Sequence, residues 1–282
     1  MAVSVVTDTG NDLSPDEGSR IGLEVVPVWI LFGSDRMRDG VDIDRARYFQ
    51  RYAAGEVPNT ESPSEDQYRE VFARLVNAGN DAVVITLSGR ISKSYASATS
   101  AAKSFGSHIH VVDSLGSSGL ETLLSYYALE LSAGGMAAPE IAKHVDPAGM
   151  KRAIYFVLSD LSTLARTGRL PQSVVSLGKT PNISIALRMN DEGLIVAGAQ
   201  SFSGEKTREQ MIDAVLRAVD HSPKTRVTFG HVQNEAAAKE LQSAFHAKLG
   251  HAPEKEYVHE SSPTIAVHQG PGSMSVCAIV PR

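Results

Sequence analysis

The stretch AVVITLSGRISKSYASATSAAKSFGSHIHVV, residues 82–112, decides the fold of this chain. It opens with an apolar run at 82–87 that lacks polar alternation, which is typical of a strand buried on both faces. Apolar residues at helical spacing follow at 95–102, and a second apolar run covers 109–112. Two buried strands joined by a helix indicate neighbouring parallel strands.

The same alternation extends in both directions along the first half of the chain. Towards the N-terminus, apolar runs lie at 3–6 and 23–31, and Pro27 inside the second run indicates a sheet edge or a bend. Ser14 and Glu17 form a capping box that begins a helix between these runs. Towards the C-terminus, a helix that stops at two glycines and a strand at 153–158 follow. We therefore predict an α/β domain over residues 1–160, with a parallel sheet covered by helices on both faces.

After residue 160 the pattern changes. Residues 183–189 and 194–199 alternate about a turn, which predicts an antiparallel hairpin. Further helices and strands follow, with the last strands expected at 265–268 and 276–280. We predict an α+β domain with antiparallel strands over residues 161–282.

Composition excludes several classes of function. The chain has 282 residues, with 27 Lys and Arg against 32 Asp and Glu, so its net charge is −5. An acidic chain of this kind is a poor nucleic-acid binder. No apolar run is long enough to span a membrane, and the N-terminus does not read as a signal peptide. The single cysteine, Cys277, lies in an apolar run, so we expect an inert core thiol and a cytoplasmic location.

Hydroxyl-rich segments lie where the first-half strands are predicted to end. The carboxyl ends of parallel strands share one edge of a sheet, and hydroxyls and free backbone N–H groups there suit an anion such as a carboxylate or a phosphate. Helix capping is the alternative explanation for many of these side chains. The segments are residues 7–9, 58–64, 88–95 and 113–114.

Motifs for cofactors and metals are missing from the sequence. No Gly-rich dinucleotide or phosphate loop is present, and no nucleophile elbow or zinc-helix motif. His108 and His110 form the only close histidine pair, and it has no further ligands at metal spacing. We therefore expect neither a cofactor nor a metal.

The residues resemble the DegV family, a group of bacterial fatty-acid-binding proteins, over nearly the whole chain. The matching motifs stand in the order of the family and are Thr7-Asp8-Thr9 with Asp12-Leu13, Thr60-x-Ser62-Pro63-Ser64, Ser88 to Tyr95, Asp113-Ser114, Gly168-Arg169 and His268-x-Gly270-Pro271-Gly272.

This resemblance implies a lipid-binding protein without chemistry of its own, which takes up one long-chain fatty acid between or within its domains. Thr60 and Ser92 would contact the carboxyl head, together with Ser62 of the same loop. Arg169 and His268 would lie near the mouth of the site, and Gly270 would supply backbone. The second domain would close the lipid site.

The resemblance also implies partners. In members that serve a fatty acid kinase, a separate kinase phosphorylates the bound carboxyl group, and the product feeds phospholipid synthesis. We expect such a kinase and transient membrane contact as possible partners, and no nucleic acid. The chain departs from the family at Gly89, Lys93, Ser94 and Thr167, and it has Ser203-Gly204 where many members carry Arg-Gly.

The physical chemistry of a fatty acid fits this interpretation. Burial of its tail contributes about 0.8 kcal/mol per methylene, or roughly 10 kcal/mol for a sixteen-carbon chain before the costs of binding. The head must then be hydrogen-bonded, because an unpaired buried carboxylate is very costly. Two other hypotheses stay open: a serine hydrolase or acyltransferase with Ser92 as nucleophile and His268 as base, and a phosphate- or sugar-binding sensor.

Overall fold

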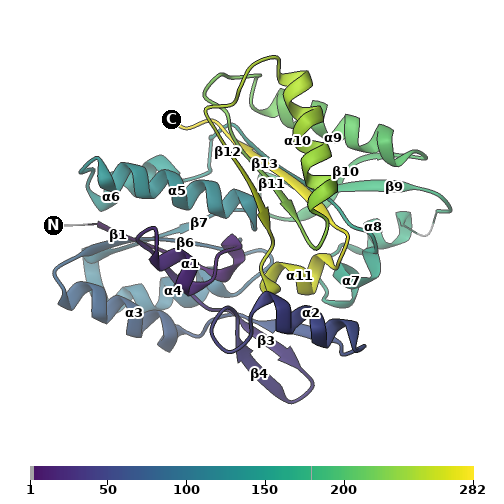
Figure 1. Ribbon diagram of the computed structural model, residues 1–282. Helices are drawn as coiled ribbons and strands as arrows, with labels where there is room; N and C mark the ends of the chain where they lie inside the picture. Colours follow the sequence, from purple (N-terminus) through teal and green to yellow (C-terminus); the bar gives the residue numbers. More distant parts are fainter. Residues whose placement is uncertain (1–2, 179) are drawn as a thin grey trace. The chain divides into compact units, whose positions relative to one another are not determined.

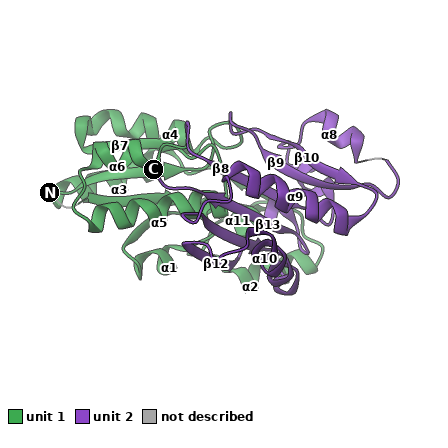
Figure 2. Cartoon of the chain, turned by 90° about the horizontal axis from the view of Figure 1, so that it is seen from above, with its two compact units in different colours: residues 1–147, 262–265 green, residues 148–261, 266–282 purple. Residues whose placement is uncertain are grey.

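The computed structural model describes residues 3–178 and 180–282, and the chain divides into two compact units (Figures 1 and 2). Unit 1 comprises Met1–Pro147 and Ser262–Ile265, and unit 2 comprises Ala148–Ser261 and Ala266–Arg282. The predicted boundary near residue 160 lies later than this division, because the strand that precedes it belongs to unit 2.

That strand is β8 (Arg152–Val157), and its placement corrects a prediction. We expected residues 153–158 to close the parallel sheet of the first half, and this is wrong. β8 pairs antiparallel with β13 (Met274–Ile279) and with β9 (Ser184–Met189) in the sheet of unit 2. An apolar run shows that a strand is buried but not which sheet it joins.

Unit 1 contains the predicted parallel sheet. Its four strands run in the order β2-β1-β6-β7, and all three pairings are parallel. Helices α5 and α6 cover one face and α3 and α4 the other (Figure 1). This arrangement confirms the α/β fold class of the first half. The strands are β1 (Val3–Asp8), β2 (Leu23–Val26), β6 (Asp81–Thr86) and β7 (Ile109–Asp113).

The helices of unit 1 begin at sequence signals. Ser14 accepts a hydrogen bond from the Glu17 backbone and completes the predicted capping box. A second capping box joins Ser64 and Gln67, and Ser62 plays no part in it. Ser62 is thereby left available for other contacts. The helices are α1 (Pro15–Ser19), α2 (Arg45–Ala53), α3 (Glu65–Asn77), α4 (Ser94–Ala102), α5 (Gly119–Ala133) and α6 (Ala138–Val145), with short 3-10 turns η1 (Thr9–Asn11) and η2 (Lys103–His108).

A small antiparallel sheet interrupts the alternation, and the sequence did not predict it. The apolar run 23–31 is split at Pro27, so that β2 forms an edge of the parallel sheet and β3 starts a second sheet. This outcome agrees with the break expected at Pro27. The small sheet has the order β4-β3-β5 and consists of β3 (Trp29–Phe32), β4 (Asp35–Arg38) and β5 (Pro58–Glu61).

Unit 2 is built on a six-stranded mixed sheet of order β10-β9-β8-β13-β11-β12. The hairpin of β9 and β10 is antiparallel, as predicted, and α9 and α10 pack their apolar faces against the sheet around Phe229 and Phe245. The remaining elements are α7 (Leu161–Arg166), α8 (Gln172–Leu177), β10 (Ile195–Ser201), α9 (Gly204–Ala218), β11 (Arg226–His231), α10 (Glu235–Leu249) and β12 (Lys255–Glu260).

The last helix, α11 (Pro263–Gln269), corrects a second prediction. We expected a strand at 265–268, and this is wrong. The Ser262 hydroxyl accepts a hydrogen bond from the Ile265 backbone, and Pro263 occupies the first turn. A serine cap followed by proline is a helix-start signal, and it outweighs the β-branched residues of the run.

Candidate functional site

Three serines of unit 1 form a connected cluster of hydroxyl groups. Ser62 lies just after β5, and Ser92 and Ser94 lie where the loop after β6 enters α4. The Ser62 and Ser92 Oγ atoms are 3.0 Å apart, and the Ser92 and Ser94 Oγ atoms are also 3.0 Å apart. The backbone N–H of Lys93 donates to Ser62 Oγ, and that of Ser94 donates to Ser92 Oγ. Ser62 and Ser92 are both partly exposed, so the outer end of the cluster is accessible.

Thr60 precedes this cluster on the same segment. It lies on β5, opposite Ile30 of β3, and its backbone N–H donates to the Asn59 side chain at 2.9 Å. The structure thus brings Ser62 and Ser92 into direct contact, and it places Thr60 two residues before Ser62. The small sheet is what carries this segment to the loop after β6.

Behind the serines lies a buried carboxyl group that our sequence analysis did not single out. Asp8 ends β1, is fully buried and accepts hydrogen bonds from the backbone N–H groups of Gly10 and Leu87 at 2.9 and 3.3 Å. Burial raises the pKa of Asp8 to about 6, although hydrogen bonds from Gly10, Ser94, Leu87 and Tyr68 favour its ionised form. The signal in the sequence was the segment 7–9, which we assigned to the predicted edge of the sheet only as a group.

A second buried carboxyl group lies at the start of the loop that precedes α2. Asp39 accepts hydrogen bonds from the backbone N–H and the hydroxyl of Thr264, at 2.9 and 2.5 Å. Burial raises its pKa to about 6, although these bonds and the charge of Arg45 favour the ionised form. Asp39 is not bonded to the serine cluster in any of the described contacts.

The other predicted site residues lie in unit 2, and two of them meet at Thr167. His268 Nδ1 lies 2.9 Å from Thr167 Oγ1, and the Arg169 guanidinium donates to the carbonyl oxygen of Thr167. Burial, together with the charges of Arg169 and Arg166, lowers the pKa of His268 to about 3. His268 therefore stays neutral at physiological pH. Thr167, which we had noted only as a departure from the family, is the contact that joins Arg169 and His268.

Gly270 follows α11 directly. Its backbone N–H donates to the Ala266 carbonyl at 2.8 Å, and its φ is +72°. A side chain at this position would be strained, and its Cβ would lie 3.3 Å from Thr163 Oγ1. The turn therefore depends on glycine.

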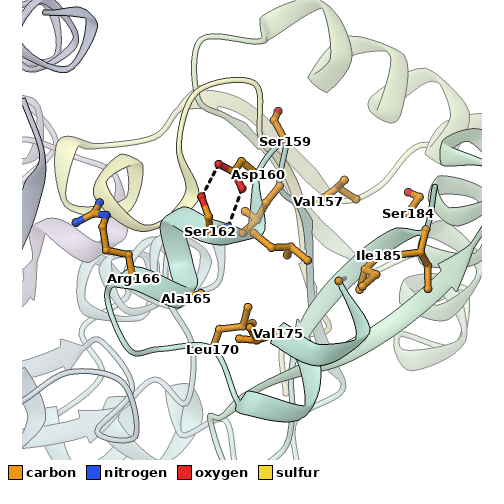
Figure 3. A pocket seen from close by; sticks show the side chains of 14 residues that line it. Val157, Ser159, Asp160, Ser162, Ala165, Arg166, Leu170, Val175, Ser184 and Ile185 are labelled. Carbon is orange, nitrogen blue, oxygen red and sulfur yellow. Dashed lines mark hydrogen bonds between the residues drawn. The ribbon is translucent and has the colours of Figure 1, made fainter. Parts of the chain in front are cut away.

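Unit 2 also holds a cavity of about 680 Å³ between α7, α8 and the ends of β8 and β9. In Figure 3, Val157, Leu170, Val175 and Ile185 are among the apolar side chains drawn around it. At one polar corner of the cavity, Asp160 accepts hydrogen bonds from the backbone N–H and the hydroxyl of Ser162, so these polar groups satisfy one another. The volume lies in the range of small-molecule pockets. Our sequence analysis could not find this cavity, because residues that line a cavity look the same as core residues.

Two smaller predictions concern metals and the thiol. Among residues 3–178 and 180–282, no group of three His, Cys, Asp or Glu side chains is arranged to hold a metal ion. Cys277 is buried in β13, as expected of a core thiol. No helix in the described part of the chain has both the length and the apolarity to cross a membrane.

The fold and the hydroxyl cluster define a two-unit α/β protein with an anion-compatible edge in unit 1 and a partly apolar cavity in unit 2. Comparison with known proteins identifies the family. A family model described as uncharacterised proteins of the DegV family matches residues 2–280, so the chain belongs to the DegV family.

Relatives of known name align along the whole chain. A DegV domain-containing protein of Deinococcus radiodurans is 28% identical, with 98% of each chain covered. A protein of Thermotoga maritima named fatty acid-binding protein is 25% identical, with 97% of this chain and 96% of that protein covered.

Solved structures match equally well. A Thermus thermophilus protein described under fatty acid binding of a DegV family protein is 26% identical, covers 99% of this chain and 100% of its own, and superimposes with a TM-score of 0.89. DegV of Bacillus subtilis, described as a fatty acid binding protein, is 22% identical over 99% of each chain with a TM-score of 0.84, and this likeness concerns the fold.

Proposed function

We propose that this chain binds one long-chain fatty acid and holds its carboxyl group with the hydroxyls of Thr60 and Ser92, assisted by Ser62. The observation that carries the proposal is the hydroxyl pair of Ser62 and Ser92, 3.0 Å apart at the carboxyl edge of the parallel sheet. The names of the Thermotoga maritima and Thermus thermophilus relatives support it.

Neutral hydroxyls suit this ligand. They satisfy the lone pairs of a carboxylate, which would otherwise be costly to bury, and they introduce no second charge. They also leave part of the head group open to a second protein. Arg169, His268 and Gly270 would then shape the mouth, with His268 acting as a neutral hydrogen-bonding group.

The tail of the fatty acid would be buried among apolar side chains. Burial of a sixteen-carbon tail contributes roughly 10 kcal/mol before the costs of binding. In this proposal the second unit closes the lipid site.

Presentation of the bound carboxyl group to a separate fatty acid kinase is a further part of the proposal, which rests on the family resemblance. The family's Arg-Gly is replaced by Ser203-Gly204, and Ser203 caps α9 by accepting from the Lys206 backbone at 3.3 Å. That position therefore supplies no cation for a phosphate. Transfer of labelled phosphate from ATP to the bound acid by a purified fatty acid kinase tests this role.

The hydrolase hypothesis gains no support from the geometry. The described hydrogen bonds of the Ser92 hydroxyl go to Ser62 and Ser94, neither of which is a base. His268 has a pKa lowered to about 3, which makes it a poor proton acceptor at neutral pH.

Native mass spectrometry tests the proposed function. The purified protein should carry one fatty acid and should take one up again after delipidation. Ser92→Ala and Thr60→Ala should each weaken binding by about tenfold to a hundredfold, as expected for a lost hydrogen bond to a charged group. Ser243→Ala, an exposed serine on α10, serves as the control. A protein that binds no long-chain acid, or variants that bind as tightly as the control, would contradict the proposal.

A further inference from the structure

Unit 2 holds a second pocket, which lies between α9 and the hairpin of β9 and β10 (Figure 2). Its volume is about 450 Å³, within the range of pockets that hold small molecules. The described residues that line it all differ from those that line the cavity beside α7 and α8. None of these described lining residues is acidic, and the polar ones are Tyr155, Arg188, Gln200, Gln210 and Arg217.

The strand register and the helix spacing bring these side chains together. Tyr155 of β8 lies directly opposite Arg188 of β9, so the two side chains leave the same face of the sheet. That face packs against α9, because Tyr155 lies against the core cluster that includes Met211 of this helix. Gln210 and Arg217 are about two turns apart on α9 and therefore lie on one side of it. The pocket is thus formed between one side of the helix and the sheet.

Strand β10 leaves room for the pocket. The pairing of β9 with β10 changes register between Ala197 and Gln200, and Gly198 lies in this irregular stretch. Such irregularities are common at sheet edges and beside active sites. A Cβ atom on Gly198 would lie 2.8 Å from Tyr155 Cε1 and 2.9 Å from the Ala186 carbonyl oxygen. Because glycine has no Cβ, the Tyr155 ring lies directly against the strand and gives the pocket an aromatic wall.

The two arginines of the pocket have no carboxylate partner. Among residues 3–178 and 180–282, neither the Arg188 nor the Arg217 side chain takes part in a hydrogen bond or an ion pair. Asp213, one turn before Arg217 on α9, is paired with Lys248 at 2.7 Å. Several other arginines that are buried or half-buried do have acidic partners, as in the pairs Arg45–Glu17, Arg51–Glu56 and Arg226–Glu254. The pocket is therefore a local excess of positive charge on a chain whose net charge is −5.

The donors of the pocket match a phosphate group. A guanidinium presents its N–H groups in a fixed fork that binds two oxygens of a phosphate or a carboxylate. A phosphate monoester carries close to two negative charges at neutral pH and has three acceptor oxygens, so it can use both arginines at once, whereas a carboxylate carries one charge. Gln200 and Gln210 add amide donors, and Tyr155 adds a hydroxyl. The volume leaves space for an organic remainder beside the Tyr155 ring and Ala214.

We propose that this pocket binds the phosphate monoester group of a small molecule or of a lipid head group, with Arg188 and Arg217 as its two cationic contacts. Arg188 is half-buried and contacts the phosphate from the sheet, whereas Arg217 is exposed and contacts it from the helix. The site does not depend on the proposed fatty-acid site, because the described residues that line it include none of those assigned to the fatty acid.

Isothermal titration of the full chain tests this site, with glycerol phosphate as the soluble probe and glycerol as its uncharged counterpart. Glycerol phosphate should bind at one site per chain, and glycerol should not bind. Added salt should weaken the binding, because the contacts are between charges near the surface. Co-sedimentation with phosphatidylcholine vesicles, with and without phosphatidic acid, tests the lipid source of the same group.

Two variants and a matched control identify the pocket. Arg188→Gln and Arg217→Gln each remove one guanidinium and should raise Kd about tenfold to a hundredfold, as expected for a lost hydrogen bond between charged groups. Because Arg217 is exposed, Arg217→Gln keeps the test valid if Arg188→Gln fails to fold. Arg208→Gln removes the same charge from the same helix, at a residue that does not line the pocket, and should leave Kd unchanged. Far-UV circular dichroism checks that each variant is folded.

Each outcome decides for or against the phosphate site. Glycerol phosphate binding that is weakened in the pocket variants supports a soluble ligand. Binding to phosphatidic acid vesicles that is weakened in the same variants supports a lipid head group. If neither probe binds, or if the pocket variants bind as tightly as Arg208→Gln, the proposal is overturned, and fatty-acid binding stands or falls on its own test.

Discussion

Asp39 allows a sharp test of how burial controls ionisation in unit 1. The side chain is 1% exposed, and its described partners are hydroxyls and a backbone N–H. Asparagine has nearly the same shape and can still accept from Thr264, but it cannot ionise. Asp39→Asn therefore isolates the cost of burying the charge.

The magnitude follows from the pKa. Burial raises the pKa of Asp39 from 3.8 to about 6. At pH values between these two, the folded protein therefore holds a proton that the unfolded chain has lost. The stabilising contribution of this proton is complete below the unfolded pKa and is lost as the pH rises through about 6. Such a shift corresponds to about 3 kcal/mol. The free energy of unfolding of Asp39→Asn minus that of the unmodified protein should thus grow by about 3 kcal/mol from about pH 3 to about pH 8.

The assay is urea unfolding followed by tryptophan fluorescence. Trp29 is the only tryptophan of the chain and lies on β3, so the signal reports unit 1. Other carboxyl groups titrate equally in both proteins and cancel in the difference. A difference that stays constant with pH, or that shrinks as the pH rises, would refute the reasoning.

Two further predictions follow. Ser14→Ala removes the accepted hydrogen bond from the Glu17 backbone and should lower the free energy of unfolding by about 1 kcal/mol in the same fluorescence assay; an unchanged midpoint would show that the cap contributes nothing. In NMR titrations, the His268 ring should show no protonation above about pH 4, because burial and nearby arginines lower its pKa. The pKa of His251 should instead lie above its ordinary value, because the ring is hydrogen-bonded to the Ala252 and His221 carbonyls. Titration of His268 near pH 6.5 would contradict the environment described for it.

The parallel sheet of unit 1 was predictable because its pattern is local. A strand buried on both faces is continuously apolar, and the helices between strands carry their own caps, as at Ser14. Sheet membership is not local. β8 carries the same apolar signature as β6, yet its partners in the sequence lie about thirty residues away in β9 and over a hundred residues away in β13.

The candidate site likewise has a part that could be predicted from the sequence and a part that could not. Ser62 and Ser92 could be predicted to lie at one edge, since the hydroxyl-rich segments follow strand ends, and their contact agrees with that expectation. The burial and raised pKa of Asp8 could not be predicted, because they depend on how other elements pack around the end of β1. The meeting of Arg169 and His268 at Thr167 depends on α11 being a helix, which the β-branched run concealed.

The segment Glu61–Ser64 is anchored at both ends. Its first residue, Glu61, is paired with Trp29 in the small sheet, and its last residue, Ser64, caps α3. Only Ser62 and Pro63 lie between these two anchors. Substitutions in this loop can therefore change which ligand it binds. Insertion or deletion of one residue would instead turn Ser62 away from the site or remove the N-terminal cap of α3. Among homologues, we expect this loop to vary in composition while its length stays fixed.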